Sequence, residues 1–261
     1  KSSLWQKAEW LAKKLPLPLP MVEVPPDRPR PATLSYAGET LEMVLGPSLV
    51  KRIRRKLKRS QVTLFMFMFA AYSYLLHRLT RCDVLPIGTV LANRTLAETE
   101  PLIGFIANTA VICVRFEDKM SFDDLLDQIK AEAMDVFHAQ DVPFEMVLSK
   151  LREASGHSHH ELGFRVMFTL QNEFTHRYRL AHTNVELNIE AGDTAKYDLI
   201  LHVYEDEDQF RLRLEYSTDL YAKSTAERFL EYYRTILEGV VEDEPVRPEH
   251  YAGGGASQAS V

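Results

Sequence analysis

The sequence is poor in cysteine and has no long apolar run. Its 261 residues include two cysteines, Cys82 and Cys113, too few for a disulfide framework or a cysteine metal site, which indicates a reducing compartment. No stretch approaches the roughly 20 uncharged apolar residues of a membrane helix, and the basic start lacks the apolar region of a signal peptide. We therefore expect a cytoplasmic protein without membrane contact.

Several enzyme signatures are also missing. The chain has no Walker loop, no dinucleotide-binding glycine fingerprint and no nucleophile elbow around a Ser or Cys. Its net charge of −6 argues against a nucleic-acid-binding surface. One basic block, residues 51–59, alternates with apolar residues at helical spacing, and we expect it to be a solvated helix face. What remains is a chain with 46% apolar residues, enough to bury a core.

Apolar spacing predicts an α/β fold with a mixed sheet flanked by helices. Helices are expected at 4–14, from Ser48 as cap onward, and at 63–79, 121–138, 143–152 and 222–240. Strands are expected at 33–46, 84–91, 105–116, 164–171, 184–190, 196–204 and 210–217. Residues 15–32 are dense in proline, so they should form an extended connector, and residues 242–261 a flexible linker.

Asn108 stands out inside "LIGFIANTAVICVRF" (102–116). Apolar residues occupy both faces of this segment, which favours an interior strand. A buried carboxamide without a partner would cost about 1 to 3 kcal/mol, so Asn108 must form hydrogen bonds. Two alternatives stay open: the side chain fastens the backbone of a neighbouring loop, or it lines a wet cavity through which a polar ligand passes.

The segment "HAQDVPFEMVL" (138–148) lies where one predicted helix ends and another begins. Pro143 restricts Val142 to non-helical geometry, and Asp141 is placed to cap the following helix. His138 is a candidate general base, although a helix-end surface residue is the simpler interpretation.

The segment "GHSHHELGF" (156–164) suggests a metal site at first sight. Its adjacent His160 and Glu161 point apart in regular structure, and no second ligand cluster with zinc spacing exists. We expect no metal there.

Seven collinear motifs make the chain resemble the condensation domains of nonribosomal peptide synthetases. They are "EVPPDRPRP" (23–31), "VTLFMFMFAAYSYLLHRLT" (62–80), "PIGTVLANR" (86–94), "LIGFIANT" (102–109), "HAQDVPFE" (138–145), "FRVMFTLQN" (164–172) and "AKYDLILHV" (195–203). The resemblance covers only the second half of such a domain, which has two lobes similar to chloramphenicol acetyltransferase. Residues 33–241 would be the C-terminal lobe, after an N-terminal helix and connector at 1–32. The catalytic HHxxxDG motif of the first lobe is missing, and His159-His160 is not followed by its Asp and Gly.

The resemblance implies that carrier proteins deliver aminoacyl and peptidyl thioesters on phosphopantetheine arms, and that no cofactor binds this chain directly. The implied partners are the N-terminal lobe, donor and acceptor carrier proteins and an adenylation domain. Arg94 matches an arginine that locks the two lobes together, and Asn108 matches a tunnel residue. Asp141 and Pro143 match a motif that shapes a turn. No catalytic residue is expected in this chain.

Two further functions stay open. One is a non-catalytic module that docks carrier proteins, and the other is an epimerisation, heterocyclisation or ester-forming relative. In addition, the segment at 156–164 departs from the family pattern, keeping neither its arginines nor its proline.

Overall fold

A six-stranded mixed sheet organises the computed structural model, which describes residues 3–155, 164–172, 177–180, 183–186 and 192–242. Its strands are β1 (Gly38–Leu45), β2 (Val84–Leu91), β3 (Asn108–Arg115), β4 (Val166–Asn172), β7 (Leu199–Glu205) and β8 (Phe210–Ser217). Their order across the sheet is β1-β8-β7-β4-β2-β3. Strand β4 runs parallel to β2 and β7, and the other neighbours are antiparallel. The predicted mixed sheet is confirmed.

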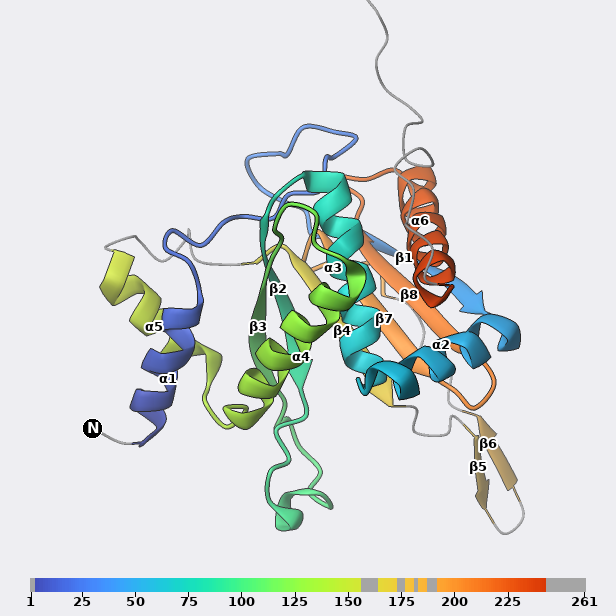
Figure 1. The fold of residues 1–261 in the computed structure, drawn as a ribbon, viewed down its shortest axis with the longest axis horizontal. Helices are drawn as coiled ribbons and strands as arrows, with labels where there is room; N and C mark the ends of the chain where they lie inside the picture. Colours follow the sequence, from blue (N-terminus) through green and yellow to red (C-terminus); the bar gives the residue numbers. More distant parts are fainter. Residues whose placement is uncertain (1–2, 156–163, 173–176, 181–182, 187–191, 243–261) are drawn as a thin grey trace, which may run out of the picture.

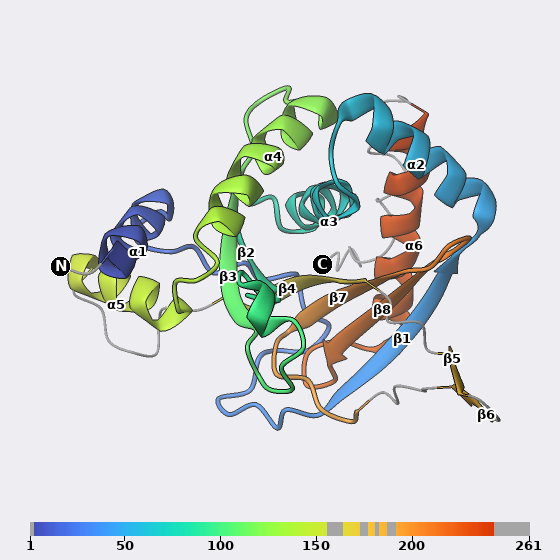
Figure 2. The ribbon, with the colours of Figure 1, turned by 90° about the horizontal axis from the view of Figure 1, so that it is seen from below.

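Six helices and a small hairpin complete the described chain (Figure 1). The helices are α1 (Ser3–Lys14), α2 (Pro47–Ser60), α3 (Leu64–Thr80), α4 (Phe122–His138), α5 (Phe144–Ser155) and α6 (Lys223–Val241), with a short 3-10 turn, η1 (Ala97–Thr99). Strands β5 (Arg177–Leu180) and β6 (Thr183–Glu186) form a separate two-stranded hairpin. Figure 2 shows α2, α3, α4 and α6 together over one face of the sheet, whereas α1 and α5 lie beside β3.

Two apolar clusters lie on opposite faces of the sheet because strand side chains alternate between them. On β3, Ile112 and Val114 belong to the large cluster under α3, α4 and α6. Val111 and Cys113, on the other face, pack with α1 and α5 in a smaller cluster. The sheet therefore has a main core along its whole width and a second core at the β3 end only.

The prediction that β3 is an interior strand is wrong. In the described chain β3 pairs with β2 alone and forms one edge of the sheet, with β1 at the other. Its two apolar faces arise because α4 covers one and the α1–α5 pair covers the other. Its free backbone edge is partly occupied by the amide of Gln128, which accepts from Arg115 N–H at 2.8 Å and donates to Arg115 O at 2.7 Å.

Helix α3 is buried on several sides, as its apolar sequence predicts. Phe67, Phe69 and Tyr72 are fully buried, and Thr63 caps the helix by accepting the N–H of Met66 at 3.2 Å. Helix α2, however, starts earlier than predicted: Gly46 is its N-cap and Pro47 its first residue, so Ser48 is not the cap. Proline suits this position because its missing N–H would have no helical partner.

The connector at 15–32 contains neither helix nor strand and joins α1, at the β3 edge, to β1 at the opposite edge (Figure 1). No single described helix is long and apolar enough to cross a membrane. The pair α2 and α3 meets that test together, but it is bent by 104°. The structure also holds Cys82 and Cys113 as free thiols.

Residues 184–186 of the strand predicted at 184–190 lie in β6, the rest of that range lies outside the described residues, and β5 was not predicted. Segment 156–163 and residues 243–261 lie outside the described residues, so the expectations for the histidine-rich segment and for the linker after Glu242 have no structural counterpart here.

Candidate functional site

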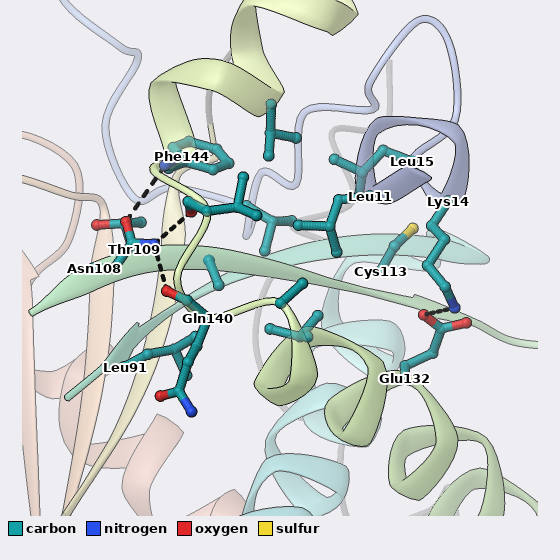
Figure 3. A pocket seen from close by; sticks show the side chains of 16 residues that line it. Leu11, Lys14, Leu15, Leu91, Asn108, Thr109, Cys113, Glu132, Gln140 and Phe144 are labelled. Atoms are coloured by element: carbon teal, nitrogen blue, oxygen red, sulfur yellow. Dashed lines mark hydrogen bonds and ion pairs between the residues drawn. The ribbon is translucent and has the colours of Figure 1, made fainter. Parts of the chain in front are cut away.

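Asn108 is the first residue of β3, where the strand meets the corner between α4 and α5 (Figure 3). Its Nδ2 donates to the carbonyl oxygens of Gln140, at 3.0 Å, and Val142, at 2.6 Å. Its Oδ1 accepts the N–H of Phe144, the first residue of α5, at 3.3 Å. One carboxamide thus satisfies three backbone groups of the corner, which is the first of the two alternatives that the sequence left open.

The chemistry of this corner explains why an amide is required. Residues between two helices leave the last carbonyls of one and the first N–H groups of the other without helical partners. The side-chain amide of Asn supplies two N–H donors and one acceptor oxygen, whereas an ionised Asp has acceptor oxygens and no donor. Val142 is buried, so these backbone groups have little access to water and their hydrogen bonds matter for stability.

Asp141 does not act as the predicted cap of α5. Both of its carboxylate oxygens lie 2.9 Å from Nζ of Lys7 in α1, and the first N–H of α5 is bonded by Asn108 instead. Pro143 immediately precedes α5, and its carbonyl accepts the N–H of Met146 at 2.9 Å. Asp141 therefore ties α1 to the corner, while Pro143 begins the turn into the helix.

A small apolar cavity lies behind the corner, between α1, β3 and α5 (Figure 3). Its volume is about 30 Å³, which is room for about one water molecule. Cys113 faces it, and burial raises the pKa of this thiol to about 11, so the sulfur stays protonated and is a poor nucleophile at neutral pH.

Arg94 lies in the loop that joins β2 to β3. Because Leu91, the last residue of β2, pairs with Asn108, the first residue of β3, this loop and Asn108 lie at the same end of the sheet. Its guanidinium donates to the carbonyl oxygens of Thr99, Glu100, at 3.2 Å, and Leu102, at 3.0 Å. The side chain therefore holds its own loop.

The same loop carries an exposed apolar tip. Ile103 and Phe105 have relative exposures of 103% and 97%. The two sides of the loop are joined by Asn93, whose Nδ2 donates to the carbonyl oxygen of Ile106 at 3.2 Å. Fully exposed apolar side chains on a braced loop are typical of an interaction surface.

His138 is the exposed last residue of α4. Among the described residues, no group of three or more His, Cys, Asp or Glu side chains could hold a metal ion.

His202 on β7 is a histidine that the sequence analysis did not single out. Its Nδ1 lies 2.8 Å from Oγ1 of Thr169 on β4. Burial, with a smaller effect of Arg213, lowers the pKa of His202 to about 4, so the imidazole is neutral at pH 7.

The connector is fastened by charged residues of "EVPPDRPRP", a role that no local spacing indicates. Asp27 accepts the N–H of Ala222, at 2.7 Å, and the hydroxyl of Thr225, at 2.9 Å, and so caps α6 from a distant part of the chain. Arg30 pairs with Asp198 at the start of β7 and with Glu23. Burial raises the pKa of Asp198, and the hydrogen bond from Arg30 opposes that rise.

Comparison with known proteins gives the family. A family model described as Condensation domain matches residues 2–250. Tyrocidine synthase 2 of Brevibacillus parabrevis is 34% identical over 238 residues, which is 90% of this chain and 7% of that protein. Malpinin synthetase of Mortierella alpina is 32% identical over 224 residues, 86% of this chain and 3% of that protein.

The fold agrees with this match. The X-domain from teicoplanin biosynthesis superposes with a TM-score of 0.79 at 23% identity, covering 95% of this chain and 56% of that one. The chain spans a small part of the curated relatives that it matches. With the match over residues 2–250 and the shared fold together, the chain belongs to the condensation domain family.

Proposed function

We propose that this chain is the C-terminal lobe of a condensation domain, which joins carrier-bound aminoacyl and peptidyl thioesters by forming an amide bond. The observation that carries the proposal is the condensation-domain match along residues 2–250 in a chain that lacks the HHxxxDG motif. Coverage of 56% of the teicoplanin X-domain chain supports one lobe of two.

In the proposed reaction the amine of the acceptor attacks the thioester carbonyl of the donor. A C–N bond forms, the C–S bond breaks, and the amine proton leaves as the phosphopantetheine thiol is released. The base or orienting histidine would come from the first lobe. This chain would supply one wall of the tunnel, and donor and acceptor carrier proteins would bring the substrates, with an adenylation domain as neighbour, in the cytoplasm.

Two surface features support a missing companion lobe. The apolar tip at Ile103 and Phe105 is exposed, and the β5–β6 hairpin projects away from the main sheet in both views (Figures 1 and 2). A two-stranded hairpin is marginally stable by itself, so both features gain stability if the first lobe packs on them.

Within this proposal the corner residues have distinct roles. Asn108 positions the wall through three backbone hydrogen bonds, and Asp141 and Pro143 shape the same corner. Arg94, whose guanidinium now contacts carbonyl oxygens, would pair with the carboxylate of HHxxxDG when the lobes meet. A carboxylate is a stronger partner for guanidinium than neutral carbonyls are, because both groups are charged.

The test is to join this chain to a first lobe that carries HHxxxDG, in a two-lobe protein, and to follow peptidyl transfer between carrier proteins by mass spectrometry. We expect product from the two-lobe protein and none from this chain alone. Arg94→Ala should lower turnover and melting temperature together, whereas Arg55→Ala, at an exposed position on α2, should leave both unchanged. Product formation by the chain alone would contradict the proposal.

The same assay separates the alternatives. A module that only docks carrier proteins would bind them without forming product. An epimerisation relative would change the chirality of the donor thioester without joining it, and an ester-forming relative would use a hydroxyl acceptor. The proposal also predicts that the reading frame encodes HHxxxDG about 120 to 150 residues before Lys1, on the expected size of a lobe.

A further inference from the structure

Helix α2 carries seven lysines and arginines and no acidic residue, in a chain whose net charge is −6. Some of these cations reach carboxylates of other elements. The pairs are Arg52 with Glu242, Arg54 with Glu205 at 3.5 Å, and Lys56 with Asp123 at 2.9 Å. The described chain therefore neutralises the positive charge of α2 only in part.

Three cations that pair with no described carboxylate share one face of α2. Lys51, Arg55 and Lys58 are exposed, and their spacing of four and three residues places them one above another on the helix. We call these three residues the α2 stripe, which extends about 10 Å at a rise of about 1.5 Å per residue. Like charges at this spacing repel each other, and α2 offers no acidic neighbour, so negative groups from outside the helix would stabilise the stripe.

A hollow with a volume of about 360 Å³ lies along the α2 stripe. It is lined by the stripe and Arg54, by the apolar Pro47 and Val50, and by Glu207 and Asp208 of the turn between β7 and β8. A flat, continuous anionic surface such as a membrane would meet the carboxylates of that turn as well as the cations. A narrow partner whose negative groups lie in one line can meet the cations alone.

We propose that the α2 stripe binds an acidic α-helix of another protein or domain, one with carboxylates at positions i, i+4 and i+7. Such a helix has the same rise per residue as α2, so each of its carboxylates can face one cation of the stripe. Complementary charge of this kind raises the rate of encounter and fixes the register of the two helices. The apolar lining at Pro47 and Val50 offers a contact for an apolar side chain beside the acidic row.

The position of α2 leaves this surface open to a partner. In both views α2 lies across the molecule from α1 and α5 (Figures 1 and 2), so a helix bound there does not cover the corner that Asn108 holds. Exposed ion pairs are weak and screened by salt, so the contact should be transient. The proposal does not depend on the proposed condensation activity, in which the stripe takes no part.

Titration of the ¹⁵N-labelled full chain with a synthetic peptide tests the proposal. The probe is an alanine-rich helix of about 18 residues with three glutamates at i, i+4 and i+7. At about 0.01 M salt we expect amide shifts in α2 and in the turn between β7 and β8, and binding at least about tenfold weaker at about 1 M salt. The triple variant Lys51→Gln, Arg55→Gln, Lys58→Gln puts another good helix former at three exposed positions, and it should weaken binding about tenfold at low salt.

Two matched controls separate the stripe from general charge attraction. The triple variant Arg81→Gln, Lys119→Gln, Lys223→Gln removes the same charge at exposed positions elsewhere and should leave the affinity for the peptide unchanged. A second peptide, with the same three glutamates on different faces of the helix, should bind several-fold more weakly.

A charge exchange gives a further measurement. Arg55→Glu should weaken binding of the probe, and a peptide with lysine in place of the central glutamate should recover it. Equal binding of the two glutamate peptides, or unchanged binding by the stripe variant, would overturn the proposal. So would binding of the chain to phosphatidylserine vesicles but not to the peptide, since that result would assign the stripe to a membrane surface.

Discussion

Replacing Asn108 by Ala should destabilise the fold far more than loss of an exposed amide does. The change removes the hydrogen bonds to Gln140, Val142 and Phe144 and leaves three backbone groups of a half-buried corner without partners. At about 1 kcal/mol for each net hydrogen bond, the free energy of unfolding should fall by about 3 kcal/mol. For a chain of this size the melting temperature should drop by about 6 to 12 °C.

The assay is urea unfolding followed by circular dichroism, with the slope of the transition unchanged. Gln128→Ala is the matched control because it also removes an amide that bonds two backbone groups, those of Arg115. Those groups are exposed, so water replaces the amide and the loss should stay under about 1 kcal/mol. If the losses in unfolding free energy of the two variants agree within about 0.5 kcal/mol, the hydrogen bonds of Asn108 do not stabilise the corner.

Asn108→Asp separates the donors from the acceptor. The carboxylate keeps an oxygen for the N–H of Phe144 but turns a negative oxygen toward two carbonyls. We expect a loss at neutral pH at least as large as that of Asn108→Ala. The loss should shrink as the pH falls, because the protonated acid regains a donor. A loss that does not depend on pH would mean that the side chain turns away from the corner.

Three further changes test other parts of the fold. Asp27→Ala should lower the unfolding free energy by about 1 to 2 kcal/mol in urea titrations by removing the cap of α6, and Asp27→Asn should restore most of it; equal losses would refute the capping role. The pKa of His202 is lowered to about 4 in the folded chain, so the unfolded chain takes up the proton first and stability should fall between about pH 6.5 and pH 4, by about 3 kcal/mol. His202→Gln should flatten that part of the pH profile of urea midpoints, and an unchanged profile would contradict the assignment. Gly88→Ala would place a Cβ 2.0 Å from Cε2 of Phe164, so it should lower the free energy of unfolding by about 1 to 3 kcal/mol. Adding Phe164→Leu to that variant should recover part of this loss in a double-mutant cycle. If the two substitutions are simply additive, the ring does not meet the new methyl group.

The sequence was sufficient to predict the six helices and the six strands of the main sheet, because burial leaves a regular apolar period, but it did not predict β5. It did not reveal that β3 is an edge strand, since apolar residues on both faces report two covering layers and say nothing about backbone pairing. The start of α2 was misplaced for a similar reason: Ser48 is a good cap by type, but the proline at position 47 suits the first helical residue better.

The candidate site residues show the same limit: the sequence can predict that a side chain is hydrogen-bonded, but it does not identify a partner far away in the chain. The cost of burying a carboxamide predicts that Asn108 is bonded, and the structure supplies its partners. Asp141 was assigned to the nearest helix end, whereas its carboxylate contacts Lys7, which is 134 residues away. The cap that Asp27 provides to α6 is equally distant in sequence, and only the folded topology brings such pairs together.

The connector also determines how tightly α1 is held. It links α1, beside one edge of the sheet, to β1 at the other, across strands about 4.8 Å apart. Its ionic contacts begin at Glu23, so residues 15–22 form the tether to α1, and Leu15 and Leu19 within it are buried in the same cluster as α1 and α5. A short tether keeps α1 close to α5 and reduces the entropy that it gains on release. Loosening those ionic contacts should therefore weaken the packing of α1, although none of them touches that helix.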